Sequence, residues 1–277
     1  MNAIEWSILL PAFAAGVLVT ATHVPLGAQV LSRGIVFVDL AIAQIAGSGV
    51  LLADRLGFEP AGIAVQIAAL SAALAGALLL TWTERLWPAV QEAVIGVVFV
   101  LAATGSLLLL ASNVHGGEHL RDLLVGQILW VTPRQLASAT VLTLAILAVW
   151  LGIGKRLGRA GFYIVFACAV TLSVQLVGVY LVFATLIVPP LATRALERGR
   201  LAASWAVGTG GYAIGLVLST SLDLPSGAVV VWVMVALALV VAARFNGRLR
   251  APARAAAEAL REPAGAPRSK ATTGRDR

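Results

Sequence analysis

The stretch GIVFVDLAIAQIAGSGV, residues 34–50, is apolar enough to lie in a lipid bilayer, yet it contains Asp39 and Gln44. An ionised carboxylate at the centre of a membrane span costs about 2.5–3.5 kcal/mol on insertion scales. Such a residue usually faces the interior of a helix bundle or a wet cavity. The segment therefore indicates a membrane protein with a buried polar site.

The composition supports the same class of protein. Of the 277 residues, 60% are hydrophobic and only 12% are charged, which exceeds the apolar content of a soluble domain. Backbone polar groups in hydrocarbon must pair internally, so only helices or closed barrels can span a membrane. Runs such as AVVVWVMVALALVV (228–241) are continuously apolar. They favour helices over strands, and we predict an all-α, polytopic membrane protein.

Eight apolar segments are candidate spans, and most are close to the roughly 20 residues needed to cross a bilayer. They are 5–22, 35–53, 60–82, 90–111, 133–152, 162–193, 201–221 and 226–243. Residues 162–193 are too many for one untilted helix and contain Gly178, Pro189 and Pro190. We therefore predict a broken or hairpin element there, and about eight to nine transmembrane segments in total.

The charged loops predict the orientation, because basic residues beside spans mark the cytoplasmic side. These loops hold Arg33, Glu84–Arg85, residues 154–159, residues 194–200 and the tail from Arg244. If 162–193 crosses twice, the N-terminus lies outside, the C-terminus lies in the cytoplasm and nine crossings result. The net charge of +7 then reflects topology and not a nucleic-acid partner. We predict a membrane domain over residues 1–246 and a basic cytoplasmic tail over 247–277. The tail is expected to be disordered, with a short helix at ARAAAEALR as the alternative for its start.

Several activities have no support in the sequence. The single Cys168 excludes a disulfide framework and a multi-cysteine zinc cluster. No G-x-x-x-x-G-K-[ST] loop occurs, so the chain cannot hold ATP phosphates by that loop. Protease and hydrolase motifs are also absent, and we expect no enzymatic activity. A pump built on this chain would draw energy from another subunit or from an ion gradient.

Five segments, in order, resemble the membrane permease of zinc/manganese ABC importers. They are PLGAQVLSRGIVFVDLAIAQIAGSGV (25–50), QEAVIGVVF (91–99), LRDLLVGQILWVTP (120–133), VGVYLVFATLIVPPLATR (177–194) and LDLPSGAVVV (222–231). Apolar runs with glycine and proline recur by chance, so each segment alone is weak. Together they are specific for the family.

The resemblance implies a permease subunit in a bacterial inner membrane that carries a divalent metal, with zinc as first choice and manganese as second. It implies a second permease protomer, expected to form a homodimer, a cytoplasmic ABC ATPase and an extracytoplasmic metal-binding protein. The metal is then the cargo, and no covalently bound cofactor is expected. The alternative is a stand-alone secondary transporter or channel, which would also place a polar residue in a broken-helix membrane protein.

Asp39 is the strongest candidate metal ligand, because carboxylate oxygen binds Zn²⁺ and Mn²⁺ well, and the resemblance aligns it with an aspartate of the family. Its alternative role is to pair with Arg33 or to cap a neighbouring helix. The family usually has a histidine four residues later, where this chain has Ala43. Gln44 points about 140° away from Asp39 on a helix, and we predict an interhelical hydrogen bond for it.

Histidines supply the remaining candidate ligands. His23 lies in THVPLG at the predicted end of the first span, where it could join Asp39 near the cytoplasmic side or simply pack against neighbours. His115, Glu118 and His119 lie together in a predicted external loop. Their residue types suit zinc. This loop is either an entry or docking loop for a binding protein, or a solvated loop.

The last candidates concern architecture and coupling. Glu92 opens the fourth span, where a carboxylate favours the positive end of the helix dipole. That structural account is sufficient, and the resemblance implies a gating or metal role as the alternative. Pro189 and Pro190 predict a bend near the cytoplasmic face. The resemblance implies an ATPase-docking element in the loop before 162–193. The candidate coupling residues there are Arg156, Gly158, Arg159 and Gly161.

Overall fold

The computed structural model describes residues 6–59, 62–110, 128–153, 156 and 158–259. All regular elements in these ranges are helical, which confirms the all-α prediction. The α-helices are α1 (Trp6–Arg33), α2 (Val38–Arg55), α3 (Ile63–Leu86), α4 (Gln91–Leu110), α6 (Pro133–Ile153), α7 (Arg159–Val177), α8 (Val179–Ala192), α9 (Arg200–Leu222) and α10 (Ser226–Ala259). Two single 3₁₀ turns, η1 (Pro88–Val90) and η2 (Ile128–Trp130), precede α4 and α6.

Seven of the described helices are long and apolar enough to cross a membrane. The two others depart for different reasons. Helix α2 has 18 residues but carries three charged residues at its ends, Asp39, Asp54 and Arg55. Helix α8 has only 14 residues, which at 1.5 Å per residue cover about 21 Å, less than the hydrocarbon core. Because seven of the described helices qualify as spans, the chain is a multi-pass membrane protein.

The long segment 162–193 is broken, as predicted, and the break lies at Gly178. This glycine has φ 84, a left-handed value that side chains disfavour, and it separates α7 from α8. Pro189 and Pro190 do not interrupt a helix. They lie inside α8, which ends two residues later at Ala192. The Thr193 amide and hydroxyl both donate to the Pro189 carbonyl, at 3.3 and 3.1 Å, and so satisfy this helix end.

Helix α1 is longer than the predicted span 5–22. It continues through Pro25 to Arg33, although the residue before a proline is a common helix boundary. Packing explains the continuation, because Leu26 and Val30 are buried. Gly27 meets α8 so closely that an added Cβ would collide with the Leu186 carbonyl oxygen. Close contact with α8 therefore holds the second half of α1 helical.

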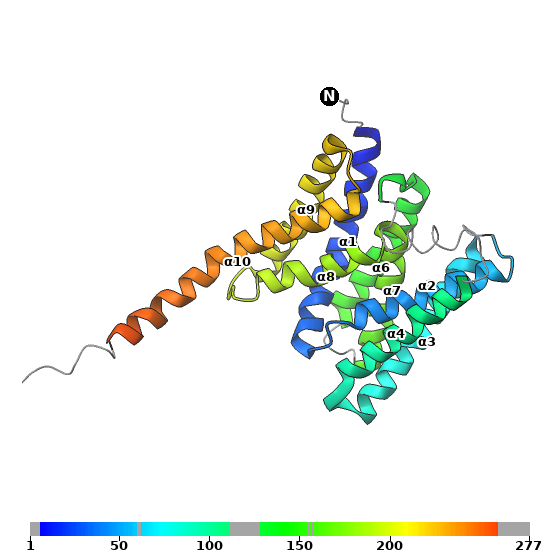
Figure 1. Cartoon of the computed structure of the whole chain (residues 1–277), viewed down its shortest axis with the longest axis horizontal. Helices are drawn as coiled ribbons and strands as arrows, with labels where there is room; N and C mark the ends of the chain where they lie inside the picture. Colours follow the sequence, from blue (N-terminus) through cyan, green and yellow to red (C-terminus); the bar gives the residue numbers. More distant parts are fainter. Residues whose placement is uncertain (1–5, 60–61, 111–127, 154–155, 157, 260–277) are drawn as a thin grey trace, which may run out of the picture.

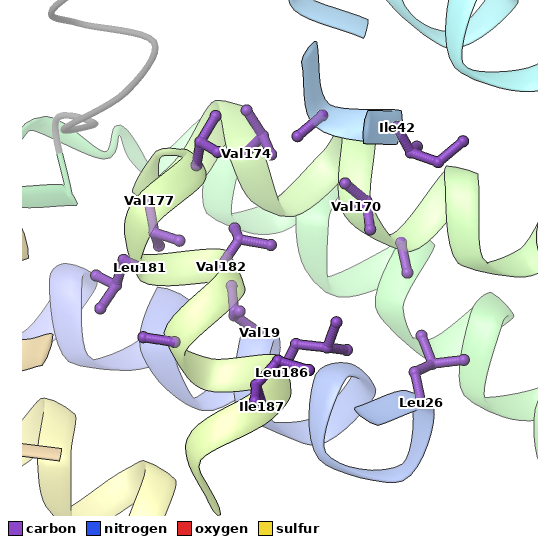
Figure 2. Close-up of a cluster of buried hydrophobic side chains, with 14 of the residues drawn as sticks. Val19, Leu26, Ile42, Val170, Val174, Val177, Leu181, Val182, Leu186 and Ile187 are labelled. Carbon is purple, nitrogen blue, oxygen red and sulfur yellow. The ribbon is translucent and has the colours of Figure 1, made fainter. Parts of the chain in front are cut away.

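The core lies where α1, α2, α7 and α8 meet (Figure 1). Figure 2 shows its apolar side chains converging from these four helices; the labelled residues are Val19, Leu26, Ile42, Val170, Val174, Val177, Leu181, Val182, Leu186 and Ile187. Helices α3 and α4 pack on α2, and α9 packs on α1. Two of the helices that form this core, α1 and α2, carry the two buried polar residues described below.

Helix α10 returns antiparallel along α9, since Gly211 lies against Met234 and Gly215 against Val230. It then projects beyond the other helices at the lower left of Figure 1. The helix passes residue 246 without a break and ends at Ala259. The helical part of the expected tail is therefore a continuation of α10.

Candidate functional site

Asp39 lies in the first turn of α2, just after the turn that follows α1. Gly34, with φ 70, lies in the turn between the two helices. The Asp39 side chain is 0% exposed, and neither Oδ1 nor Oδ2 has a hydrogen-bond partner among the described residues. The helix dipole favours a carboxylate at this end. Burial without partners is nevertheless costly, so the side chain requires a further explanation.

Arg33 does not provide that explanation. Its guanidinium lies over the Phe162 ring, 3.9 Å from the centroid. The ion pair seen in the described part of the chain joins Arg159 to Glu84, and none joins Arg33 to Asp39. The alternative role for Asp39, as a partner of Arg33, is thus not found, and the side chain does not face lipid either.

His23 is also fully buried, and its position differs from the prediction. It lies inside α1 and not at the end of the helix, because the helix continues for ten further residues to Arg33. Its Nδ1 is 3.1 Å from the Val19 carbonyl oxygen and 3.0 Å from the Thr22 hydroxyl. A carbonyl only accepts, so we assign the proton to Nδ1. Nε2 then keeps its lone pair and is buried without a partner, the form in which imidazole binds metals.

The two residues face the same apolar core. Val19 and Leu26 lie four residues before and three after His23, hence on its helix face, and Ile42 lies three after Asp39. Figure 2 shows all three apolar side chains in the core formed with α7 and α8. No group of three or more His, Cys, Asp or Glu side chains forms within the described ranges. The described part of the chain thus offers separate ligand atoms and not the closed four-ligand cage of a structural zinc site.

The structure also shows the consequence of Ala43, which stands where the family usually has a histidine. Ala43 is buried and offers no ligand atom on the face of Asp39. Gln44 does not make the predicted interhelical hydrogen bond in the described structure. Ser48, one turn further on, links α2 to α4 instead: its hydroxyl is 2.8 Å from the Ser106 hydroxyl and 3.3 Å from the Ala102 carbonyl oxygen.

Glu92 lies in the first turn of α4, as the helix-dipole argument predicts. Its Oε1 also accepts the Phe37 backbone N–H at 3.1 Å. Phe37 is the N-cap residue of α2, two positions before Asp39. Sequence reasoning missed this contact, because 55 residues separate the two partners and no local pattern predicts it.

The remaining candidates divide into two groups. His115, Glu118 and His119 lie outside the described residues. In the candidate coupling segment, Arg156 is exposed, and Gly158 and Arg159 are the N-cap and first residue of α7. The Arg159 Nε lies 3.5 Å from Glu84 Oε1, a contact to α3 that the sequence did not indicate. Gly161 lies in the same first turn.

Two apolar hollows lie on the membrane-spanning part of the molecule. One, of about 380 Å³, lies between α1, α6 and α9; the other, of about 280 Å³, lies between α1 and α9. Neither includes Asp39 or His23 among its lining residues. Both residues are themselves 0% exposed in this conformation.

Comparison with known proteins identifies the family. The model of the ABC 3 transport family matches residues 5–158 and 147–245, so the chain belongs to this family. It is a membrane permease of the ABC transporter type. No curated protein sequence matches the chain.

Two solved structures share the fold. PsaBC from Streptococcus pneumoniae, in complex with a Fab, superimposes with a TM-score of 0.69 at 20% identity, over 86% of this chain and 91% of the other. An inward-facing transporter described as of the metal-chelate ABC type gives a TM-score of 0.62 at 16% identity, over 85% of each chain. At these identities the likeness shows the fold alone.

Proposed function

We propose that this permease belongs to an ABC importer that carries a divalent transition metal, with zinc as first choice and manganese as second. The observation that carries the proposal is the pair of buried, unpartnered ligand groups, the Asp39 carboxylate and His23 Nε2. Carboxylate and imidazole suit both metals. The likeness in fold to a transporter described as of the metal-chelate type is consistent with a cargo that contains a metal.

In this proposal the Asp39 charge compensates the charge of the cation inside the apolar core. His23 adds a neutral ligand, held in its metal-binding tautomer by the Val19 carbonyl. Zinc takes about four ligands, so water, backbone oxygen or the second protomer completes the shell. A site that must release its cargo gains from an incomplete set, because tight binding at every step would prevent exit.

The partners follow from the same assignment. A cytoplasmic ATPase supplies energy that this chain has no loop to capture, and an extracytoplasmic binding protein delivers the metal. The second protomer is a copy of this chain. With the N-terminus outside and the C-terminus in the cytoplasm, Arg33, Arg85 and Arg159 lie on the cytoplasmic side, where Arg156, Gly158, Arg159 and Gly161 are placed to contact the ATPase.

The test is ATP hydrolysis by the reconstituted complex, scanned over Zn²⁺, Mn²⁺, Fe²⁺ and Ni²⁺. We expect stimulation by zinc or manganese in the wild type and its loss in Asp39→Ala. Asp54→Asn, at the far end of the same helix, is the matched control and should respond as the wild type does. Uptake that ignores ATP depletion but collapses with the proton gradient would instead support a secondary transporter.

A further inference from the structure

Polar and aromatic side chains tie together the ends of four helices, and the proposed metal ligands do not include them. We call this group the helix-end cluster. Its members are Arg33 of α1, Glu84 of α3, Gln91 and Glu92 of α4, and Arg159, Phe162 and Tyr163 of α7.

The first turns of α7 are the centre of the cluster. Arg159 pairs with Glu84 at the end of α3, and Phe162 lies beneath the Arg33 guanidinium at the end of α1. Phe162 is 1% exposed, so water does not reach the face of the guanidinium that lies against the ring. The first turns of α7 therefore contact the ends of both α1 and α3.

Gln91 connects the same part of α7 to α4. Its amide nitrogen donates to the Leu80 carbonyl at 3.0 Å and lies 3.5 Å from the Tyr163 hydroxyl. The Thr83 hydroxyl donates to the Gln91 amide oxygen at 3.2 Å. Gln91 and Tyr163 are both buried. Buried hydrogen bonds of this kind make the contact between their helices rigid.

Glu92, the next residue, reaches from α4 to the start of α2. Phe37 is the N-cap of α2 and provides no side-chain cap. Glu92 accepts the Phe37 N–H, which is the bond that a glutamate of the same helix makes in a capping box. Here the glutamate comes from another helix. Its Oε1 thereby fixes the start of α2 only two residues before Asp39.

We propose that Glu92 is a positioning residue for Asp39, and that the helix-end cluster couples movement of α7 to the placement of Asp39. The inference rests on the proposed function. The Arg159 end of the cluster lies in the segment assigned to the ATPase contact, and the Glu92 end lies at the metal ligand. Movement at one end therefore reaches the other through side-chain contacts that the structure contains.

The experiment compares Glu92→Ala with Glu92→Gln in the complete complex in proteoliposomes. An amide oxygen can still accept the Phe37 N–H, whereas alanine cannot. We expect metal transported per ATP hydrolysed to fall about tenfold in Glu92→Ala, the scale of a lost hydrogen bond to a charged group. Glu92→Gln should stay within about twofold of the wild type. Exposed Glu197→Ala is the control for removal of a carboxylate.

A second pair of variants removes the donor instead of the acceptor. Phe37→Pro deletes the N–H, and the φ of −86 at this position is close to the value that proline requires. Phe37→Ala loses the same ring but keeps the N–H. We expect Phe37→Pro to reproduce the Glu92→Ala loss and Phe37→Ala to remain close to the wild type. Hydrogen exchange of the amides in residues 34–40 should rise in Glu92→Ala and Phe37→Pro alone.

Each outcome decides the question. Equal losses in Glu92→Ala and Glu92→Gln would show that charge matters and not the bond to Phe37, and would overturn the inference. A normal ratio of metal transported to ATP hydrolysed in Glu92→Ala would also overturn the inference, provided that zinc stimulates the wild-type complex in the same preparation. If Glu92→Ala does not fold, the two Phe37 variants decide alone. A wild-type complex that no divalent metal stimulates would contradict the proposed function, and the inference with it.

Discussion

At the scale of the single residue, burying the polar side chains of Asp39 and His23 without partners for all of their atoms lowers the stability of the protein. Both side chains are fully buried, and their Oδ1, Oδ2 and Nε2 atoms have no partner among the described residues. Replacing an unsatisfied polar group by an apolar one of similar shape is neutral or stabilising. A residue that lowers stability in this way is a candidate for a functional role. Its replacement should therefore impair transport without lowering the stability of the protein.

Asp39→Leu should therefore abolish metal-stimulated ATP hydrolysis while the melting temperature of the purified complex stays the same or rises. Ile42→Ala, on the same helix face, is the matched control. It should lower stability, by about 2–5 kcal/mol for a buried large-to-small change, without removing metal stimulation from the folded fraction. A strongly destabilised Asp39→Leu would indicate that the carboxylate has a structural partner.

His23→Gln tests the second ligand. An amide is a poorer ligand for zinc than imidazole, so the metal concentration for half-maximal uptake should rise, by about tenfold or more on the scale seen for perturbed metal sites. Thr22→Val removes the hydroxyl next to Nδ1 and is the control, because the Val19 carbonyl still accepts from Nδ1. An unchanged concentration dependence in His23→Gln would remove this residue from the site.

At the scale of the element, the contact between α1 and α8 decides where His23 lies. Both helices approach at Gly27, where a Cβ would collide with the Leu186 carbonyl oxygen. The backbone cannot yield as a flexible side chain could. The close approach brings Leu26 into the core beside α8 and keeps α1 helical past Pro25.

Gly27→Ala should consequently lower the melting temperature and the yield of folded protein. Gly96→Ala is the control, because among the described residues no atom outside its own stretch of helix lies within 4 Å of the position of its Cβ. There alanine should be neutral or should stabilise α4 by up to about 1 kcal/mol through helix propensity. Thermal melting monitored by size-exclusion chromatography measures both. Equal behaviour of the two variants would contradict the close packing of α1 on α8.

The helices could be predicted from the sequence better than their ends. Apolar runs near 20 residues identified the spans, and Gly178 marked the break between α7 and α8. The length of α1 could not be predicted, because a local rule at Pro25 competes with packing on a helix more than 150 positions away. The burial of Asp39 followed from its cost in lipid. The contacts of Glu92 with Phe37 and of Arg159 with Glu84 join distant residues, and no spacing in the sequence encodes them.

At the scale of the whole molecule, the proposed orientation in the membrane can be measured. Cys168 is the only cysteine, so a Cys168→Ser background allows single cysteines to be introduced elsewhere. With the N-terminus outside, an impermeant thiol reagent should label Asp223→Cys in intact cells. Arg198→Cys should react only after the membrane is opened. Both residues are exposed in the structure, and the reverse pattern would invert the proposed topology.

The most direct test of the account is X-ray absorption at the zinc edge of the intact, zinc-loaded complex in nanodiscs. We predict a shell of nitrogen and oxygen ligands with the outer-shell scattering of imidazole. That scattering should disappear in His23→Gln, and stoichiometric zinc should be lost in Asp39→Ala but retained in Asp54→Asn. Spectra and zinc content that are identical in the wild type and in both ligand variants would contradict the assignment of these residues to the metal.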